Sequence, residues 1–422
     1  MGHRILVVGR GAREHAICWK LAQSNVVDAL YCAPGNPGIA EHAGLIDVDP
    51  MDIPNVVRVA REHEIDLVVI GSEDPLAIGL TDSLEAAGIL VAGPTMAAAQ
   101  LEASKSFANS VMASANVATA QSITVSNRDE GVRAIGELMN HHGVVVKADG
   151  LAAGKGVVVA DTAPEAINAL DEMLVQGSMG DAGRTIVVEE RLVGPEVSVL
   201  CLCDGTTLYP LQPSCDYKRA FDNDEGPNTG GMGNYTPTKF LDDAMMARIE
   251  NDILLPTIRE MANRGTPMKG VLFAGLMLCD DGPKVIEFNC RPGDPETEVV
   301  LPVLDGDLGE LLYAMATGTL ADQPRPRSHG AAVGVVLASE GYPQGYPKGL
   351  PITGLNQIEN AIVFHAGTAL DGDTLVTNGG RVLCVVSLGE TIAEARNAAY
   401  AATEVIHFDG AWKRNDIALR EA

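Results

Sequence analysis

Short apolar runs that favour an extended chain recur over the first hundred residues and alternate with helical stretches. Arg4–Val8, Leu67–Ile70 and Ile89–Ala92 are three such runs, and each leads into a glycine-containing turn. This alternation predicts a doubly wound, Rossmann-like sheet whose ligand loops follow the carboxyl ends of the strands. The first turn, Gly9–His15, is not a dinucleotide fingerprint, because a glutamate stands where the third glycine is required. A phosphate at the N-terminus of the next helix, assisted by Arg13, and a plain glycine turn both stay open.

The next segment combines two predicted helices with a glycine-rich hairpin. Glu102–Ala115 and Asp129–His141 have helical character, and Val144–Val159 contains two β runs around a loop of small residues. Glycines expose backbone N–H groups, so such a hairpin can cover phosphates, with Lys147 ending the first run and Lys155 starting the second. The loop is one residue short of a Walker A motif and lacks its Ser or Thr. The alternative is a plain hairpin with solvated lysines.

A further strand, Ile186–Leu192, ends in polar residues that could bind a nucleotide. Its edge could hold adenine and Glu196 could hold ribose hydroxyls, although a surface strand explains the same residues. Val197–Cys203 and Thr206–Leu211 predict a β-hairpin, and Pro213–Pro237 predicts a long loop. Long ordered loops in compact domains are usually functional, so this loop is a candidate part of the site.

The stretch Lys284–Glu298, KVIEFNCRPGDPETE, is the strongest candidate for metal chemistry. Its apolar residues predict a short strand on which Glu287 and Asn289 share one face, because successive side chains alternate. A carboxylate beside an amide oxygen suits Mg²⁺, which prefers oxygen ligands and keeps several waters. Arg291 follows within reach and could neutralise a carboxylate substrate by a bidentate contact. Asp294–Thr297 then predict a tight polar turn. The alternative is an edge strand with a wet face and a charged turn.

The last hundred residues predict a separate, smaller α/β piece. A change of composition near residues 318–329, with prolines and charges, indicates a linker. The remaining predicted elements are a helix at Leu241–Ala262, a strand at Val271–Leu278 that pairs with the candidate metal strand, strands at Ala331–Leu337, Ala361–His365 and Arg381–Ser387, and a helix at Thr391–Ile406.

Composition narrows the class of protein. The chain has 422 residues and a formal net charge of −26. This length predicts two to four domains, and the acidic balance argues against a nucleic-acid partner. No apolar run approaches the roughly 20 residues of a membrane span, and the N-terminus has too short an apolar core for a signal peptide. The eight cysteines contain no C-x-x-C pair, so free thiols and a cytoplasmic location are expected.

Seven motifs occur in a fixed order along the chain: VVGRGAREHA, APGNPG, LEASKSF, KADGLAAGKGV, GPNTGGMG, VIEFNCRPGDPETE and TNGGRVLCV. Together they resemble the phosphoribosylamine–glycine ligases, or glycinamide ribonucleotide synthetases, of the ATP-grasp superfamily. The resemblance implies a multidomain α/β and α+β fold. It consists of an N-terminal Rossmann-like domain at 1–103, an ATP-grasp core at 104–325 with a mobile lid near 123–187, and a small C-terminal α/β domain at 326–422.

The resemblance also implies roles for individual residues. Glu287 and Asn289 match ligands of Mg²⁺ or Mn²⁺. The other matches are Lys105, Lys147, Glu189, Glu190, Leu192, Glu196 and Phe288 for ATP; Asp216, Lys218 and Arg291 for glycine and the acyl phosphate, with Arg291, Lys147 and Asp216 as the catalytic set; and Gly11, Arg13, Glu14 and His15 for phosphoribosylamine.

The chain departs from the family pattern at several positions. None is a presumed metal ligand or either phosphate lysine, so the departures affect details of substrate binding and leave the reaction unchanged. They are Ser72, Asn109, Cys215, Tyr217, Pro292 and Ala418.

The implied reaction joins 5-phosphoribosylamine to glycine, with ATP as co-substrate and a glycyl phosphate intermediate, in purine biosynthesis. The hairpin Lys147–Gly156 would act as a lid that excludes water. Only small-molecule partners and a monomer are expected. Three alternatives are another ATP-grasp carboxylate–amine ligase, a nucleotide-dependent dehydrogenase and a non-catalytic binding module. The N-terminal turn and the GPNTGGMG loop argue against another ligase of the superfamily. The broken fingerprint argues against a dehydrogenase, and the intact pair of candidate metal ligands argues against a non-catalytic module.

Overall fold

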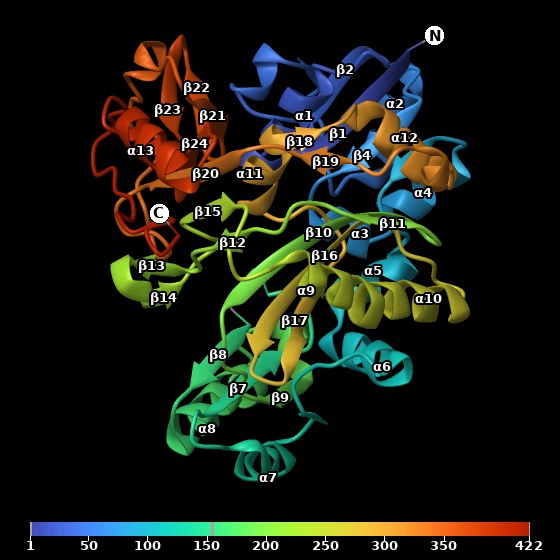
Figure 1. Ribbon diagram of the computed structural model, residues 1–422, viewed down its shortest axis with the longest axis vertical. Coiled ribbons are helices and arrows are strands. Elements are labelled where there is room, and N and C mark those ends of the chain that lie inside the picture. Colours follow the sequence, from blue (N-terminus) through green and yellow to red (C-terminus); the bar gives the residue numbers. More distant parts are fainter. Residues whose placement is uncertain (1, 153–155, 422) are drawn as a thin grey trace.

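The N-terminal part of the protein is a doubly wound domain, as predicted. The computed structural model describes residues 2–152 and 156–421, which form a broad body and a smaller projecting lobe (Figure 1). The first elements are β1 (His3–Gly9), α1 (Ala12–Leu21), β2 (Val27–Pro34), β3 (Gly44–Leu45), α2 (Ile53–Glu62), β4 (Leu67–Ile70), α3 (Glu73–Ala77), α4 (Leu80–Ala86) and β5 (Leu90–Ala92). They form a parallel sheet in the order β3-β2-β1-β4-β5. Ile5 and Val7 share a core with α1, while Leu6 and Val8 pack with α2 and α4 on the other face.

The helix predicted at Glu102–Ala115 is wrong as a single element. It is divided into α5 (Met96–Ala103) and α6 (Lys105–Ala115) by Ser104, whose backbone is extended. The Ser104 side chain accepts a hydrogen bond from the Phe107 N–H at 3.1 Å. This N-cap satisfies one of the unpaired donors of α6 and places Lys105 at the first helical position.

The projecting lobe contains the predicted glycine-rich hairpin. Its elements are β6 (Ser122–Val125), α7 (Arg128–Leu138), β7 (Val144–Ala148), β8 (Val157–Ala160), α8 (Ala163–Leu170) and β9 (Ile186–Glu190). The strands form an antiparallel sheet in the order β6-β9-β7-β8, with α7 and α8 packed against it (Figure 1). The expected phosphate contacts of Gly154 and Lys155 lie outside the described residues.

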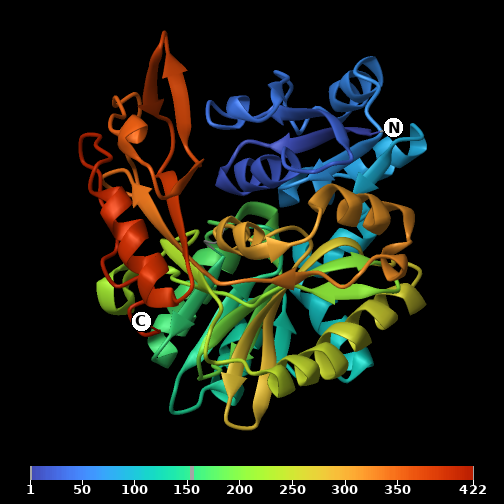
Figure 2. The same ribbon diagram turned by 45° about the horizontal axis from the view of Figure 1, so that its top comes forward.

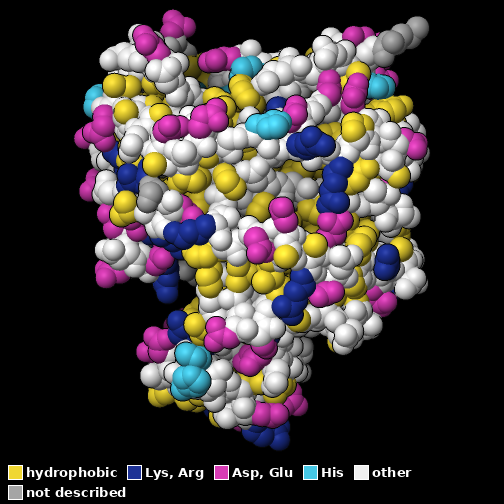
Figure 3. All heavy atoms as spheres, viewed as in Figure 1, with side chains coloured by type: hydrophobic (Ala, Val, Ile, Leu, Met, Phe, Trp, Pro, Cys, Tyr) yellow, Lys and Arg dark blue, Asp and Glu magenta, His cyan; other side chains and the backbone are white. Residues whose placement is uncertain are grey.

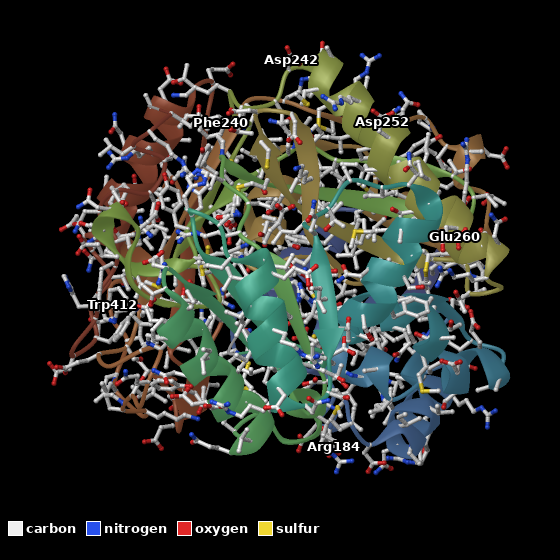
Figure 4. All side chains as sticks on the ribbon, turned by 90° about the horizontal axis from the view of Figure 1, so that it is seen from below. Arg184, Phe240, Asp242, Asp252, Glu260 and Trp412 are labelled. Atoms are coloured by element: carbon white, nitrogen blue, oxygen red, sulfur yellow. The ribbon has the colours of Figure 1, made fainter. Side chains whose placement is uncertain are left out.

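A four-stranded antiparallel sheet at the centre carries the candidate metal strand. The elements are β10 (Glu196–Asp204), β11 (Leu208–Pro210), β16 (Lys269–Cys279) and β17 (Gly282–Asn289), in the order β11-β10-β16-β17. The predicted pairing of Val271–Leu278 with the metal strand is therefore confirmed. Helices α9 (Asp243–Ile249) and α10 (Leu255–Asn263) cover one face of this sheet, joined by a π-helical turn (Figure 4).

The segment Pro213–Pro237, predicted as a long loop, contains four short strands. They are β12 (Cys215–Asp216), β13 (Arg219–Phe221), β14 (Glu225–Asn228) and β15 (Gly233–Thr236). Two of them join the C-terminal strands β20 (Ala331–Ala338), β21 (Ile362–His365) and β24 (Arg381–Gly389) in the order β12-β15-β20-β24-β21. Helix α13 (Ile392–Thr403) packs against β20 and β24, and Figure 2 shows this domain beside the N-terminal one. The pairing partner of β15 lies about a hundred residues away, which explains why local sequence gave no strand signal.

The polar turn predicted at Asp294–Thr297 is shorter than predicted, because only Asp294 and Pro295 form it. Glu296 begins α11 (Glu296–Val303), and Glu296, Thr297 and Glu298 are all buried in its first turn. Part of the predicted linker is ordered as well, because β19 (Arg327–Ser328) pairs with β18 (Leu304–Asp305), and α12 (Leu308–Thr317) lies between them in the chain. Thus α11 is positioned to bring buried carboxyl groups to the central sheet.

The cysteines and the charged surface can be compared with what composition predicts. All eight cysteines are free thiols, and seven are buried, including Cys201 and Cys203 on one face of β10. Acidic side chains are spread over the face shown in Figure 3, in keeping with the net charge of −26. Within residues 2–152 and 156–421, no helix has the length and apolar character that crossing a membrane requires.

Candidate active site

Glu287 and Asn289 share one face of β17, as the alternation of side chains predicts. Cross-strand pairing sets Gly275 beside Glu287 and Phe273 beside Asn289 on β16. A β-bulge leaves Ile286 without a cross-strand partner, because Gly275 pairs with Glu287 and the next residue pairs with Val285. The two oxygen-bearing side chains therefore lie together where a hard cation could bind them.

Phe288, expected at the ATP site, faces the opposite side of the strand. It is 3% exposed and belongs to the core formed with α6 and α10. Its role in ATP binding stays a prediction, and in this structure it supports the strand that carries Glu287 and Asn289.

Glu287 is surrounded by cations. Burial would raise the pKa of its carboxyl, but the positive charges of Lys218, Lys147, Lys105 and Arg291 outweigh this effect and lower the pKa. The carboxylate is thus ionised at neutral pH and able to bind a metal. Among the described residues there is no cluster of three or more His, Cys, Asp or Glu side chains suited to a metal. Two protein ligands fit an ion that completes its shell with water and phosphate oxygens.

Lys147 connects the lobe to the central sheet. Its ammonium lies 2.6 Å from a carboxylate oxygen of Glu189 on β9, and both side chains are buried. The same ammonium donates a hydrogen bond to the carbonyl of Ile286 at 3.1 Å, on the bulge of β17. A lysine from the lobe is therefore held directly beside the candidate metal ligands Glu287 and Asn289.

A second connection between the lobe and the body involves Lys105 and Asp149. The Lys105 ammonium donates to the carbonyl of Gly150 at 3.3 Å, and its pKa is lowered, chiefly by burial. The Asp149 carboxylate accepts hydrogen bonds from the Ser106 N–H at 2.7 Å and the Ser106 hydroxyl at 2.6 Å. The LEASKSF and KADG motifs thus meet in space. Asp149 lies in the second of these motifs, but the sequence alone assigns it no role.

Asp216, Lys218 and Glu196 form the side of the site nearest β10. Lys218 pairs with Glu196 at 2.8 Å. Burial raises the pKa of Asp216 to about 6, against the opposing effect of Lys218. The predicted substrate residues Asp216 and Lys218 therefore lie close to the predicted ribose contact, Glu196.

Arg291 is held by two acidic side chains that the sequence did not single out for it. Its guanidinium donates to Glu73 at 3.1 Å and lies 3.0 Å from Glu102. A third bond goes to the carbonyl of Pro292 at 3.3 Å. A guanidinium has five N–H donors, so others stay available to a substrate carboxylate. Of these two acids, the sequence patterns single out only Glu102, which begins a predicted helix and lies in the motif LEASKSF.

The N-terminal turn places Gly11, Arg13 and Glu14 near the same arginine. The Glu14 carboxylate accepts from the Gly11 N–H at 2.6 Å and lies 2.7 Å from Arg13. Arg13 also donates to the carbonyl of Pro292 at 3.3 Å. The turn is thus joined to the segment that follows the metal strand, and Arg13 is 8% exposed.

His15 lies at the contact between the N-terminal and C-terminal domains. Its Nδ1 accepts a hydrogen bond from the backbone N–H of His365 at 2.8 Å. Burial, then the neighbouring His365 and His42, lower the pKa of His15 strongly. His15 is therefore a neutral side chain, and His365 is a buried histidine beside it.

Arg381 of the TNGGRVLCV motif completes the site from the C-terminal domain. It pairs with Asp294 at 2.9 Å and donates to the carbonyl of Gly230 at 2.6 Å. This arginine joins the GPNTGGMG loop to the segment after the metal strand. In the sequence, the only indication of a role for Arg381 is that it lies in the motif TNGGRVLCV.

Glu190, Leu192 and two of the departures from the family pattern have the following positions. The Glu190 carboxylate accepts from the Gln121 N–H at 3.0 Å, and Leu192 is the second residue after the end of β9. Asn109 donates to the Ser122 hydroxyl at 3.0 Å, which ties α6 to the lobe. Ala418 has a φ of 59°, a left-handed conformation that glycine adopts at less cost.

Comparison with known proteins decides the family. Three models of phosphoribosylglycinamide synthetase match: the N domain over residues 3–102, the ATP-grasp (A) domain over 103–297 and the C domain over 332–420. The chain belongs to the phosphoribosylglycinamide synthetase family. A relative from Rhodopirellula baltica, a phosphoribosylamine–glycine ligase, is 46% identical over 98% of this chain and 97% of its own.

Solved structures agree with this assignment. The crystal structure of phosphoribosylamine–glycine ligase from Thermotoga maritima has a TM-score of 0.86 and 32% identity, covering 98% of this synthetase-family chain and all of that one. The biotin carboxylase domain of a Hydrogenobacter thermophilus 2-oxoglutarate carboxylase has a TM-score of 0.74 at 17% identity, over 98% of this chain and 92% of its own. The second likeness shows the shared ATP-grasp fold alone.

Proposed function

We propose that this chain is the ATP-dependent ligase that joins 5-phosphoribosylamine to glycine, giving glycinamide ribonucleotide, ADP and phosphate in purine biosynthesis. The observation that carries the proposal is the position of Lys147, which reaches from the lobe to the bulge beside Glu287 and Asn289. A phosphate-binding lysine and a pair of metal ligands then act on one nucleotide. Because the chain matches the family along its full length, we propose the family's substrates for it.

Glu287 and Asn289 would hold a divalent cation, and we propose Mg²⁺ or Mn²⁺. An ionised carboxylate and an amide oxygen on one strand face fit such an ion, as do the adjacent cations that attract phosphate. When bound, the ion supplies charge neutralisation for the transferred phosphoryl group.

The chemistry has two steps. A carboxylate oxygen of glycine attacks the γ-phosphorus of ATP, and the bond between that phosphorus and the bridging oxygen of ADP breaks. The amine of phosphoribosylamine then attacks the acyl carbon, and the carbon–oxygen bond breaks so that phosphate leaves with one oxygen from glycine. Phosphoryl transfer depends mostly on positioning and charge stabilisation.

The side chains described above would supply that positioning. Lys105 and Lys147 hold the ATP phosphates in line with the glycine carboxylate. Arg291 is fixed by Glu73 and Glu102, so its remaining donors are pre-oriented toward a carboxylate. The lobe that carries Lys147 would cover the acyl phosphate and keep water from it.

The test is an assay of ADP release by the purified protein. We expect ADP to form only when glycine and phosphoribosylamine are both present, in proportion to glycinamide ribonucleotide. ADP release with another acid or amine, and none with these two, would indicate a different ATP-grasp carboxylate–amine ligase. ADP release that is independent of both substrates would contradict the proposal.

A further inference from the structure

Tyr217 lies between two residues of the candidate site, and its side chain takes the opposite face of the chain. Successive side chains of an extended chain alternate, so Asp216 and Lys218 face the site while the Tyr217 ring enters a buried core. The backbone of Tyr217 continues the pairing of β12 with β15. Its N–H donates to the carbonyl of Gly233 at 3.0 Å, and its carbonyl accepts from the N–H of Met232 at 2.8 Å. Contacts that hold this ring therefore also hold the backbone that carries Asp216 and Lys218.

Two guanidinium groups lie over the Tyr217 ring, and both come from residues 414–421, here called the C-terminal segment. The guanidinium carbons of Arg414 and Arg420 are 4.6 and 4.8 Å from the ring centroid. Cation–π attraction acts within about 6 Å of a ring centroid and is stronger for a cation shielded from water. Arg414 is buried, whereas Arg420 is exposed and also lies over Tyr235 and Phe240. The ring is thus held by one buried and one exposed cation of the same segment.

Arg414 is fixed by bonds to its own segment and to the hairpin of β13 and β14. Its guanidinium donates to both carboxylate oxygens of Asp416, at 2.8 and 2.6 Å, and to Asp224 at 2.9 Å. The carbonyl of Arg219, the residue after Lys218, accepts a further bond at 2.9 Å. A planar guanidinium held in this way has a fixed orientation, so it offers the Tyr217 ring a rigid surface.

The other side of the C-terminal segment is joined to α13 of the C-terminal domain. Arg396 of this helix donates to the carbonyls of Asn415 and Ile417 at 2.7 and 2.9 Å. Tyr400 donates to the carbonyl of Arg414 at 2.8 Å and accepts from the N–H of Ile417 at 3.0 Å. Figure 1 shows the end of the chain beside β12, β13 and β14. The segment therefore connects the C-terminal domain to the strand that carries Asp216.

Three of the departures from the family pattern meet at this connection. Cys215, Tyr217 and Ala418 belong to one buried core, the first two from the strand and the third from the C-terminal segment. Residues that share a core are energetically coupled. The grouping of these departures therefore indicates that the strand and the segment are adapted to each other in this chain.

We propose that the C-terminal segment clamps the Tyr217 ring and thereby positions Asp216 and Lys218 for the reaction of glycine. This inference rests on the proposed function. Arg414 and Arg420 are positioning residues in this role, because they act through the ring and not on a reacting atom. A displacement of about 1 Å at a reacting group can cost about 10²-fold in rate, so contacts remote from the chemistry can control it.

The first experiment compares Tyr217→Leu with the conservative variant Tyr217→Phe. Leucine fills much of the buried space but offers no ring to the cations, so kcat/KM for glycine should fall about 10–100-fold. Phenylalanine keeps the ring and should stay within about threefold of the native value. The KM for ATP should change by less than about twofold in both variants, because Lys105 and Lys147 lie on other elements. ADP release at varied glycine and varied ATP gives these constants.

The second experiment removes one cation and uses a matched control. Arg420→Gln should lower kcat/KM for glycine about 3–10-fold, the scale of one cation–π contact, and Arg420→Lys should recover most of the loss. The control is Arg4→Gln in the N-terminal sheet. Arg4 lies 5.8 Å from the ring centroid of Tyr31 and donates to its hydroxyl at 3.3 Å, as Arg420 donates to the Tyr235 hydroxyl at 3.3 Å. Arg4→Gln should leave kcat/KM for glycine unchanged.

The double variant of Arg420→Gln with Tyr217→Leu shows whether the arginine acts through the ring. It should lose no more activity than Tyr217→Leu alone, whereas two independent effects would multiply. All assays are made well below the unfolding temperature of each variant, measured by circular dichroism, so that loss of folded protein does not enter. If Tyr217→Leu does not fold, the exposed Arg420 still tests the clamp through Arg420→Gln, Arg420→Lys and the control.

Several results would overturn the inference. A native kcat/KM for glycine in Tyr217→Leu or in Arg420→Gln would show that the site does not depend on the clamp. An equal loss with Arg4→Gln would show a general structural effect, and a multiplied loss in the double variant would show that Arg420 does not act through the ring. A native protein with no glycine-dependent ligation would instead contradict the proposed function, and the inference with it.

Discussion

Replacing Lys147 by Met separates two effects that the structure places on one side chain. The ammonium neutralises the buried Glu189 at 2.6 Å and, by the proposed function, stabilises phosphate during transfer. Methionine keeps the length of the aliphatic stem and removes the charge. Loss of one electrostatic stabiliser costs about 10²–10³ in kcat, or about 2.7–4 kcal/mol.

The same substitution leaves Glu189 buried without a partner. Both side chains are less than a tenth exposed, so solvent screening is weak. Breaking a buried ion pair by removing one partner costs about 3–5 kcal/mol of stability. Lys147→Met is therefore expected to lower both the kcat and the temperature at which the lobe unfolds.

The double variant Lys147→Met with Glu189→Gln distinguishes the two effects. Its neutral pair should recover most of the lost stability, because no unpaired charge is left inside the protein. The kcat should stay about 10²–10³ below the native value, since the phosphate still lacks its cation. ADP release gives the kcat, and circular dichroism gives the unfolding temperature. If kcat recovers together with stability, Lys147 acts on structure alone, and the phosphate role is refuted.

Three further outcomes are expected. Glu287→Ala should abolish ligation while leaving the unfolding temperature nearly unchanged, and near-native turnover at limiting Mg²⁺ would refute the metal assignment. Glu298→Gln should raise the unfolding temperature more at pH 8 than at pH 5, as measured by calorimetry. Burial holds the pKa of Glu298 well above 4.5, so the folded state binds this proton more tightly than the unfolded state does. The native protein therefore loses stability as the pH rises above 4.5, and the glutamine variant does not. An equal gain at both pH values would contradict this. Glycine labelled with ¹⁸O in its carboxylate should pass one labelled oxygen to phosphate, detected by mass spectrometry, and unlabelled phosphate beside the amide product would exclude the acyl phosphate.

Local sequence patterns predicted the strands and side-chain positions that depend only on neighbouring residues. The runs at Arg4–Val8 and Leu67–Ile70 became β1 and β4, because strands buried on both faces are continuously apolar. Alternation placed Glu287 and Asn289 on one face without any knowledge of the partner strand. The ordered motifs supplied the family, which no single pattern could establish.

The features that the sequence did not predict depend on contacts between residues that are distant in sequence. Strands β12 and β15 contain Gly, Asn and Asp, which have weak strand propensity. They exist because β15 pairs with β20, and β12 pairs with β15. The partners of Arg291, Glu73 and Glu102, come from other elements, the first of them 218 residues away. The break at Ser104 is stabilised by contacts with the glycine-rich hairpin, through Asp149. Such pairings follow from the folded arrangement and leave little trace in neighbouring residues.

An acidic protein that binds ATP must concentrate its few basic side chains, and the structure shows how. With a net charge of −26, the surface potential repels nucleotides at long range. Glu287 nevertheless lies among four cations, which keep its carboxyl ionised despite burial. Three of these, Lys147, Lys218 and Arg291, are paired with acids, which lowers the cost of holding them in a partly buried site before ligand arrives. ATP phosphates would then compete with these acids for the same cations, so the local arrangement of charge, and not the net charge, determines nucleotide binding.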